Sequence, residues 1–164
     1  GRKELNQPTN VAVLFIKLGH LATDQARWQD AETCYLKALD MLPLHVVDHQ
    51  SEARAGLVAV YQNLHQSEKI ADHLESAVAF ILETDQRRGY WEPYRTAYTL
   101  YLCLIQMGDK RAKLVIAKAS EWLKTQLAKL KDPDNQRSFL HGDRARREIA
   151  ALNQENQLLE LPLK

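Results

Sequence analysis

Two histidines, His45 and His49, stand four residues apart, which is the spacing of paired metal ligands on one face of a helix. Pro43 lies just before them and disfavours a helical conformation at His45, because proline cannot continue a helix. Neither histidine has a cysteine beside it, and two ligands do not complete a zinc site. We therefore expect no metal at this pair.

Nucleophilic catalysis would require a serine or cysteine beside a base and an orienting acid, and the sequence has no local signature of that arrangement. Cys34 and Cys103 lie among apolar residues, where a thiol is normally inert, and we expect both to be reduced. The sequence also lacks GxGxxG and the phosphate loop GxxxxGK followed by Ser or Thr. We expect no bound cofactor and no enzymatic activity.

A basic cluster formed by Arg144, Arg146 and Arg147 could contact a phosphate or an acidic partner. Asp143 and Glu148 interleave with it, which favours a solvated, ion-paired helix face. Across the chain, 22 basic side chains oppose 21 acidic ones, so the formal net charge of +1 creates no global field for nucleic acid or an anionic membrane. We expect neither as a direct partner.

The bulk composition is that of an ordinary globular chain. Its 164 residues are 45% hydrophobic and 26% charged, long enough for one domain with a sizeable core. No apolar run approaches the roughly 20 residues of a spanning helix, and the amino-terminal residues do not resemble a signal peptide. We expect a cytoplasmic protein and, from the start at Gly1 without methionine, a piece of a longer one.

The elements that must position these residues are helices. In residues 14–43, Leu14, Leu18 and Leu21 recur at i, i+4 and i+7, which predicts one apolar helix face. Gly19 leaves that helix thin, so a second helix can approach closely. Pro43 ends the second helix, whose matching face follows the same spacing: Ala31, Tyr35, Ala38 and Leu42.

Later segments repeat this helical period with weaker signatures. Gly89 and Gly108 mark turns, and Asp132 and Asp143 are predicted helix caps. The first helix is expected to begin after a cap at residue 9 or 10, and a fourth helix after one at residue 67. We predict three hairpins at about residues 10–43, 48–84 and 91–130, followed by capping helices at 132–159.

The first hairpin resembles the tetratricopeptide repeat on these residues: Leu18-Gly19, Ala26, Ala31, Tyr35, Ala38 and Pro43. The tail from Gly108 is similar to the end of the tetratricopeptide region of bacterial STAND-class signalling ATPases. The residues that carry this second resemblance are Gly108-Asp109, Asp132-Pro133, Arg137-Ser138-Phe139-Leu140, Arg147-Glu148-Ile149 and Ala151-Leu152. The resemblance departs at residues 141–144 and at Lys113, where a small residue is expected.

The resemblance implies an all-α fold, a TPR-like α-solenoid of three antiparallel hairpins with capping helices. It also implies a non-enzymatic module for signal transduction or transcription regulation, which binds a protein, peptide or small effector and controls an attached switch. In such stacks the first helix of each hairpin lines a concave groove. Here the groove residues would be Ile16, His20, Thr23, Gly56, Val60, Asn63, Tyr94, Arg95, Tyr98 and Leu102.

Two alternatives remain open at the level of the sequence. A structural module that pairs with a copy of itself is a second functional class, with an apolar patch buried in a homodimer. Tyr94, Tyr98 and Tyr101 fall on helical spacing, so they are as well suited to the core as to a contact surface. Burial separates these last two possibilities.

Overall fold

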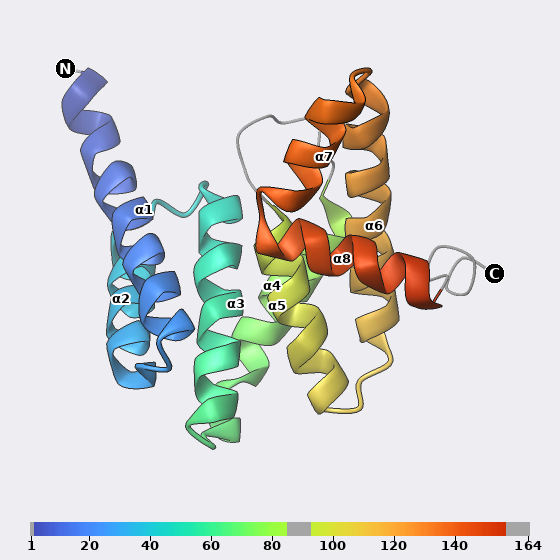
Figure 1. The fold of residues 1–164 in the computed structure, drawn as a ribbon. Helices are drawn as coiled ribbons and strands as arrows, with labels where there is room; N and C mark the ends of the chain where they lie inside the picture. The colour runs from blue at the N-terminus through green and yellow to red at the C-terminus, as the bar shows by residue number, and fades with distance from the viewer. Residues whose placement is uncertain (1, 85–92, 157–164) are drawn as a thin grey trace. The chain divides into compact units, whose positions relative to one another are not determined.

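The computed structural model describes residues 2–84 and 93–156, and within them the chain is all-helical, without a strand (Figure 1). Its side chains are described for residues 8–84 and 93–153. The predicted turn at Gly89 lies outside the described residues. The elements are α1 (Arg2–Asp24), α2 (Trp28–Met41), α3 (Val47–Asn63), the 3-10 turn η1 (Ser67–Lys69), α4 (Ala71–Glu83), α5 (Pro93–Gln106), α6 (Arg111–Lys129), α7 (Pro133–His141) and α8 (Arg144–Asn156).

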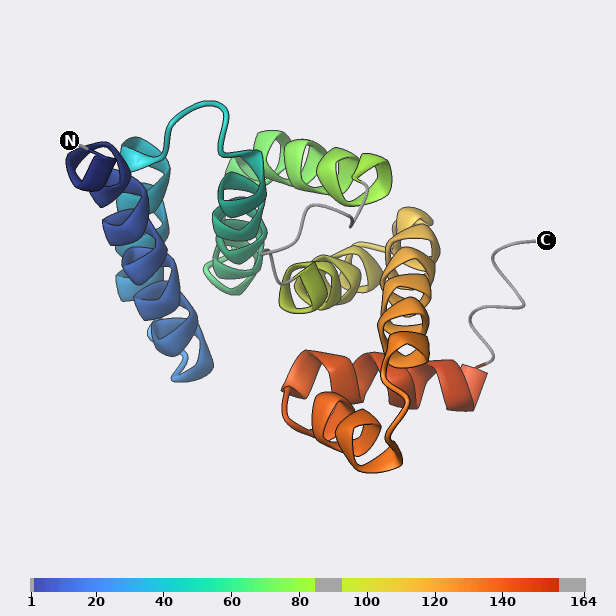
Figure 2. The ribbon, with the colours of Figure 1, turned by 90° about the horizontal axis from the view of Figure 1, so that it is seen from above.

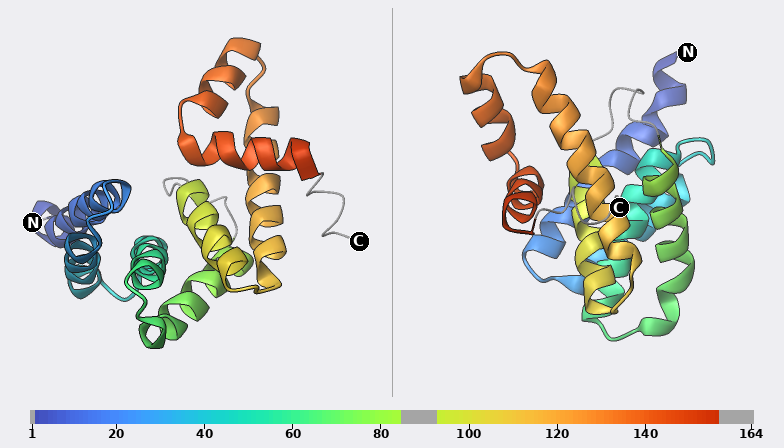
Figure 3. Two further views of the ribbon diagram at one scale, coloured as in Figure 1. Left: turned by 60° about the horizontal axis from the view of Figure 1, so that its bottom comes forward. Right: turned by 90° about the vertical axis from the view of Figure 1, so that its right-hand side faces the viewer.

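The structure divides into two compact units. Unit 1 covers residues 1–80 and unit 2 covers residues 81–164, so the boundary falls inside α4. In unit 1, α1 and α2 form a hairpin and α3 packs mainly on α2 (Figure 2). In unit 2, α5 and α6 form a second pair, and α8 lies across both (Figure 3).

The turns after α1, α3 and α5 share one backbone geometry. Ala26, His65 and Gly108 all have positive φ, at 56°, 56° and 68°. In each case the N–H of the following residue bonds to the carbonyl five positions back, as in Arg27 to Ala22 at 2.8 Å. This bond pattern closes a helix in a Schellman motif. The motif recurs about every 40 residues. The chain therefore repeats a helix-and-turn unit, although the side chains of the three units differ.

The first hairpin buries the predicted face of its second helix but a different face of its first. Ala31, Tyr35 and Ala38 are buried, as predicted. The prediction for α1 was wrong, because its three leucines are between 50% and 59% exposed. Both faces of α1 have apolar residues at helical spacing. The face with the smaller side chains packs on α2, because small side chains allow the two helices to approach closely. The buried residues of α1 are Ala12, Ile16, Gly19 and Ala22.

Helix starts test the predicted caps. Helix α1 begins at Arg2 instead of after residue 9 or 10, so the predicted cap there was wrong. Pro8 lies inside the helix, which tolerates it because one proline near the start removes a single backbone donor. Ser67 lies in the 3-10 turn instead of capping α4 directly. The Asp132 carboxylate accepts from Asp134 N at 2.9 Å and Asp143 from Arg146 N at 3.0 Å, which confirms both predicted caps.

The apolar positions of the later helices are largely as predicted. Buried side chains face inward at Ala53, Leu57, Val60 and Tyr61 of α3, and at Leu74, Ala77 and Val78 of α4. In α6 they are Ala112, Val115, Ile116, Ala119, Trp122 and Leu123, and in α8 Ala145 and Ile149. Lys113 is exposed, so its position tolerates a long charged side chain.

A polar cluster between the first and third helices

A chain of polar contacts links α1, α2 and α3 in unit 1. His20 of α1 places its Nδ1 2.7 Å from the Tyr35 hydroxyl and its Nε2 2.8 Å from Oε1 of Glu52 in α3. The Thr23 hydroxyl donates to the carbonyl of Gly19 at 2.8 Å and lies 3.2 Å from the Tyr35 hydroxyl. The imidazole of His20 in α1 therefore contacts both α2, through Tyr35, and α3, through Glu52.

The direction of these bonds follows from the proton inventory. An ionised Glu52 only accepts, so Nε2–H of His20 donates to it. If His20 is neutral, its Nδ1 accepts the Tyr35 proton, and no proton lies between Tyr35 and Thr23. If His20 is protonated, Nδ1–H donates to the Tyr35 oxygen and the Tyr35 hydroxyl donates to Thr23. The direction of the bond between His20 and Tyr35 therefore decides whether the Tyr35 hydroxyl can also donate to Thr23.

The Tyr35 ring lies between two glycines of different helices. A Cβ built on Gly19 would stand 2.6 Å from the ring, and one built on Gly56 would stand 2.4 Å from it. Real Cβ contacts are not that short, so any side chain at either position would displace the ring. The ring is 1% exposed. Two glycines therefore let α1, α2 and α3 close on one aromatic side chain and set its hydroxyl against His20.

Glu52 is ionised at neutral pH despite its position. Burial alone would raise the pKa of its carboxyl, but the hydrogen bond from His20 and the interaction with His49 outweigh burial and hold the pKa at about 2. The Nδ1 atom of His49 lies 3.7 Å from Oε2 of Glu52, an ion-pair distance too long for a hydrogen bond. The Glu52 carboxylate, with Asp48, raises the pKa of His49 against the lowering effect of burial.

The predicted groove residues separate into accessible and buried ones. Ile16, Gly56, Val60 and Tyr94 are buried, so these four cannot contact a partner in this conformation. They were wrong as contact residues because they pack against neighbouring helices, Gly56 against the Tyr35 ring. His20, Thr23, Arg95 and Tyr98 are half-buried, and Asn63 and Leu102 are exposed. Among the aromatic residues left open above, Tyr94 belongs to the core, and Tyr98 and Tyr101 are half-buried.

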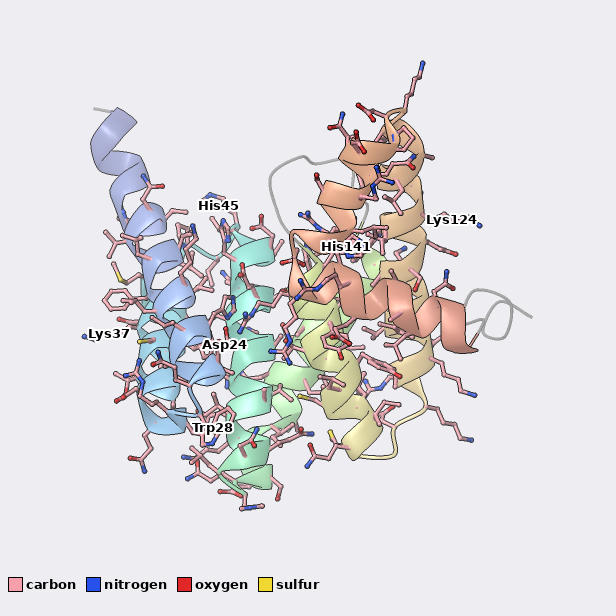
Figure 4. The ribbon with its side chains drawn as sticks, in the orientation of Figure 1. Asp24, Trp28, Lys37, His45, Lys124 and His141 are labelled. Atoms are coloured by element: carbon pink, nitrogen blue, oxygen red, sulfur yellow. The ribbon has the colours of Figure 1, made fainter. Side chains whose placement is uncertain are left out.

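Within the predicted groove set, the structure brings His20 and Thr23 together through their shared contact with Tyr35. The sequence interpretation placed Tyr35 only in the core and overlooked Glu52. One signal was present: His49 and Glu52 stand three residues apart and so share a helix face. His49 was considered only with His45, which lies outside a helix in the segment before α3 (Figure 4).

The cluster offers hydrogen-bonding groups and charge, and the Tyr35 side chain within it is buried. The described part of the chain contains no group of three or more His, Cys, Asp or Glu that could hold a metal ion. Both cysteines are thiols, and burial raises the pKa of Cys103 to about 12, which keeps it protonated.

Two arginines of the basic cluster in α8 contact α7. The Arg146 guanidinium lies 4.0 Å from the centre of the Phe139 ring and 5.4 Å from that of Tyr94, and it donates to the Phe139 carbonyl at 3.2 Å. Arg147 donates to the carbonyl of His141 at 3.1 Å. These side chains therefore hold α7 against α8, and the ring contacts of Arg146 lie within unit 2.

Comparisons with family models, with curated proteins and with solved structures find no match for this chain. Among the described residues, no helix is both long enough and apolar enough to cross a membrane.

Proposed function

We propose that this chain is a non-enzymatic binding module, a TPR-like α-solenoid that recognises a protein, peptide or small effector. The observation that supports this most directly is the recurring helix closure at Ala26, His65 and Gly108. Repeated helix hairpins build extended surfaces whose spacing serves packing and whose exposed residues serve recognition. The tetratricopeptide pattern of the first hairpin agrees with this function.

The binding site in this proposal is the surface between α1 and α3 around His20 and Glu52. The side chains of His20 and Glu52 are 16% and 20% exposed, so their accessible edges can meet a ligand while their other contacts fix their positions. Thr23 is half-buried, and Asn63, about three helical turns beyond Glu52 on α3, is exposed and donates from its amide to the carbonyl of Ala59. Imidazole, carboxylate, hydroxyl and amide groups favour a polar ligand that both donates and accepts hydrogen bonds.

The biological context in this proposal is regulation within a larger bacterial signalling ATPase or transcriptional regulator, as the resemblance of the tail implies. A ligand that binds one arrangement of the module better than another shifts the attached switch by that difference in affinity. Nucleotide binding and any catalysis belong to other parts of such a regulator.

Thermal denaturation with pools of synthetic peptides tests the binding site. A ligand that binds only the folded state at 100 times its Kd stabilises it by about 2.7 kcal/mol, so a binding pool raises Tm. Thr23→Val and Asn63→Ala should reduce that rise, whereas Thr33→Ala, exposed on α2, should not. The proposal fails if pools that stabilise the wild type stabilise the two site variants equally, or if no pool stabilises the wild type.

A further inference from the structure

Helix α1 carries an apolar stripe on the side away from its buried face. The stripe consists of Val11, Leu14, Leu18 and Leu21, which are 39%, 59%, 50% and 50% exposed. His20 lies roughly 160° around the helix from Leu18, since successive residues are about 100° apart. The stripe is therefore a different surface from the polar cluster.

The shared turns identify the equivalent positions in α3 and α5. Leu14, Leu18 and Leu21 lie 12, 8 and 5 residues before the left-handed residue Ala26. The same offsets from His65 and from Gly108 give two further triplets, and all six of those residues are at most 4% exposed. They are Ala53, Leu57 and Val60 in α3, and Thr96, Leu100 and Cys103 in α5.

In α3 this arc of the helix faces α2. On one side of the arc stands Gly56, which meets the ring of Tyr35. On the other side stands Tyr61, whose hydroxyl has its pKa raised to about 12 by burial and by the Glu32 carboxylate of α2. The positions between them are covered by α2, which precedes α3 in the chain. The equivalent positions of α1 hold larger apolar residues that remain about half exposed. The stripe thus has the position and chemistry of a helix-packing surface.

The spacing of the stripe reads the same in both directions, with intervals of three, four and three residues. These are the a and d positions of a heptad, the pattern by which two helices pair. An antiparallel copy of α1 would set Leu14 against the partner subunit's Leu18 and Val11 against the partner subunit's Leu21. The symmetry axis would pass near residue 16. Such self-complementarity is what a twofold interface requires.

We propose that the occupant of this surface is a second copy of the chain, paired through antiparallel α1 helices about a twofold axis. The ligand-binding site of each copy stays on a separate face. The stripe offers four partly exposed side chains, less than the roughly 800 Å² per partner of a standard interface. The dimer should therefore dissociate on dilution. Lys17 flanks the stripe near the axis, so the two lysines repel and salt should strengthen association.

Light scattering across a concentration series tests the interface on the chain itself. The wild type should approach twice the monomer mass at high concentration. Leu18→Lys should stay monomeric, with unchanged helical circular dichroism and with the Tm of the dilute, monomeric wild type. Leu114→Lys is the matched control, because Leu114 is 49% exposed on α6 and lies outside the stripe. A monomeric wild type at every concentration, a dimer that survives Leu18→Lys, or association lost at high salt would overturn the proposal.

Charge exchange tests the antiparallel register. Leu14→Lys and Leu18→Glu should each be monomeric, and mixing them should restore a heterodimer, because positions 14 and 18 face each other. Mixing Leu14→Lys with Leu21→Glu should not, because those positions are not opposed. Equal recovery in both mixtures, or recovery in neither, contradicts the proposed register. Peptide stabilisation of Leu18→Lys should match that of the wild type, so the two proposals can fail separately.

Discussion

At the scale of single residues, the Tyr35 hydroxyl contacts His20 and Thr23 of the polar cluster. Its ring fills the space left by two glycines. Alanine normally stabilises a helix by about 1 kcal/mol relative to glycine. Here a Cβ at Gly56 would stand 2.4 Å from the ring, and overpacking costs about 1 to 3 kcal/mol. Since the overpacking cost is partly offset by the helix propensity of alanine, Gly56→Ala should destabilise the protein by about 1 kcal/mol in urea unfolding.

Replacing Tyr35 provides the control for that substitution. Tyr35→Leu removes the outer ring atoms that face Gly56. In that background Gly56→Ala should be neutral or stabilising, so the coupling energy of the double-mutant cycle should have the opposite sign to the single effect. If Gly56→Ala costs the same in both backgrounds, the ring is not the cause.

The three left-handed turn residues give a reciprocal pair of substitutions. An L-residue with positive φ carries a cost of about 1 to 2 kcal/mol that glycine does not, set against the greater flexibility of glycine in the unfolded chain. Ala26→Gly should stabilise by about 0.5 to 1 kcal/mol, and Gly108→Ala should destabilise by about 1 kcal/mol. Nothing lies within 4 Å of a Cβ at Gly108, so the second effect is purely conformational.

Urea unfolding measures both turn substitutions, and Ala79→Gly is the matched control. Ala79 is exposed within α4, where glycine should cost about 1 kcal/mol. The geometry of the first turn would be contradicted if Ala26→Gly lowered stability as much as Ala79→Gly does.

At the scale of elements, Glu52 of α3 accepts a hydrogen bond from His20 of α1. Because this bond favours the ionised carboxylate, the stability of the fold depends on pH. Its pKa is about 2 in the folded state against an ordinary value of 4.5, so the folded state favours the carboxylate. The resulting stability, on the order of 3 kcal/mol, is complete above pH 4.5 and is lost as pH falls toward 2. Glu52→Gln should remove this dependence and flatten unfolding free energies measured between pH 2 and 5.

His49 also makes stability depend on pH, but with the opposite sign to Glu52. Its folded-state pKa is raised above 6.5, so its contribution is present below pH 6.5 and is lost as pH rises through the folded-state value. Unfolding free energies of the wild type should decline on that alkaline side, and those of His49→Gln should decline less. A steeper decline in His49→Gln than in the wild type would contradict the proposed ion pair with Glu52.

The helical period and the caps at Asp132 and Asp143 were predictable from local chemistry, whereas the start and the orientation of α1 and the cap expected at residue 67 were not. Asp132 and Asp143 act within three residues of their own positions, so a sequence pattern contains the whole interaction. The face of α1 depends on Tyr35, 16 residues beyond Gly19, and on Gly56 in another helix. Two faces of α1 have apolar spacing, and the choice between them is made by tertiary packing. The polar cluster around His20 and Glu52 was not predicted for the same reason, because it joins residues that are far apart in the sequence.

At the scale of the whole molecule, each unit has its own polar tie. Unit 1 is joined by the His20–Glu52 contact, and unit 2 by Arg146 over the Phe139 and Tyr94 rings. Local opening should follow these units, because a region opens with the free energy of its own contacts. The boundary inside α4 then separates two regions of hydrogen exchange.

Arg146→Ala tests this division. The variant loses the guanidinium's ring contacts and its bond to the Phe139 carbonyl, which together contribute about 1 to 2 kcal/mol. Amides of α7 and α8 should exchange faster by about tenfold, a change of 1.4 kcal/mol, while those of α1 to α3 keep their wild-type rates. Arg144→Ala, exposed on the same helix, should change neither set. Equal acceleration in α1 to α3 would show that the two units open as one, because a shared opening exposes both sets of amides together.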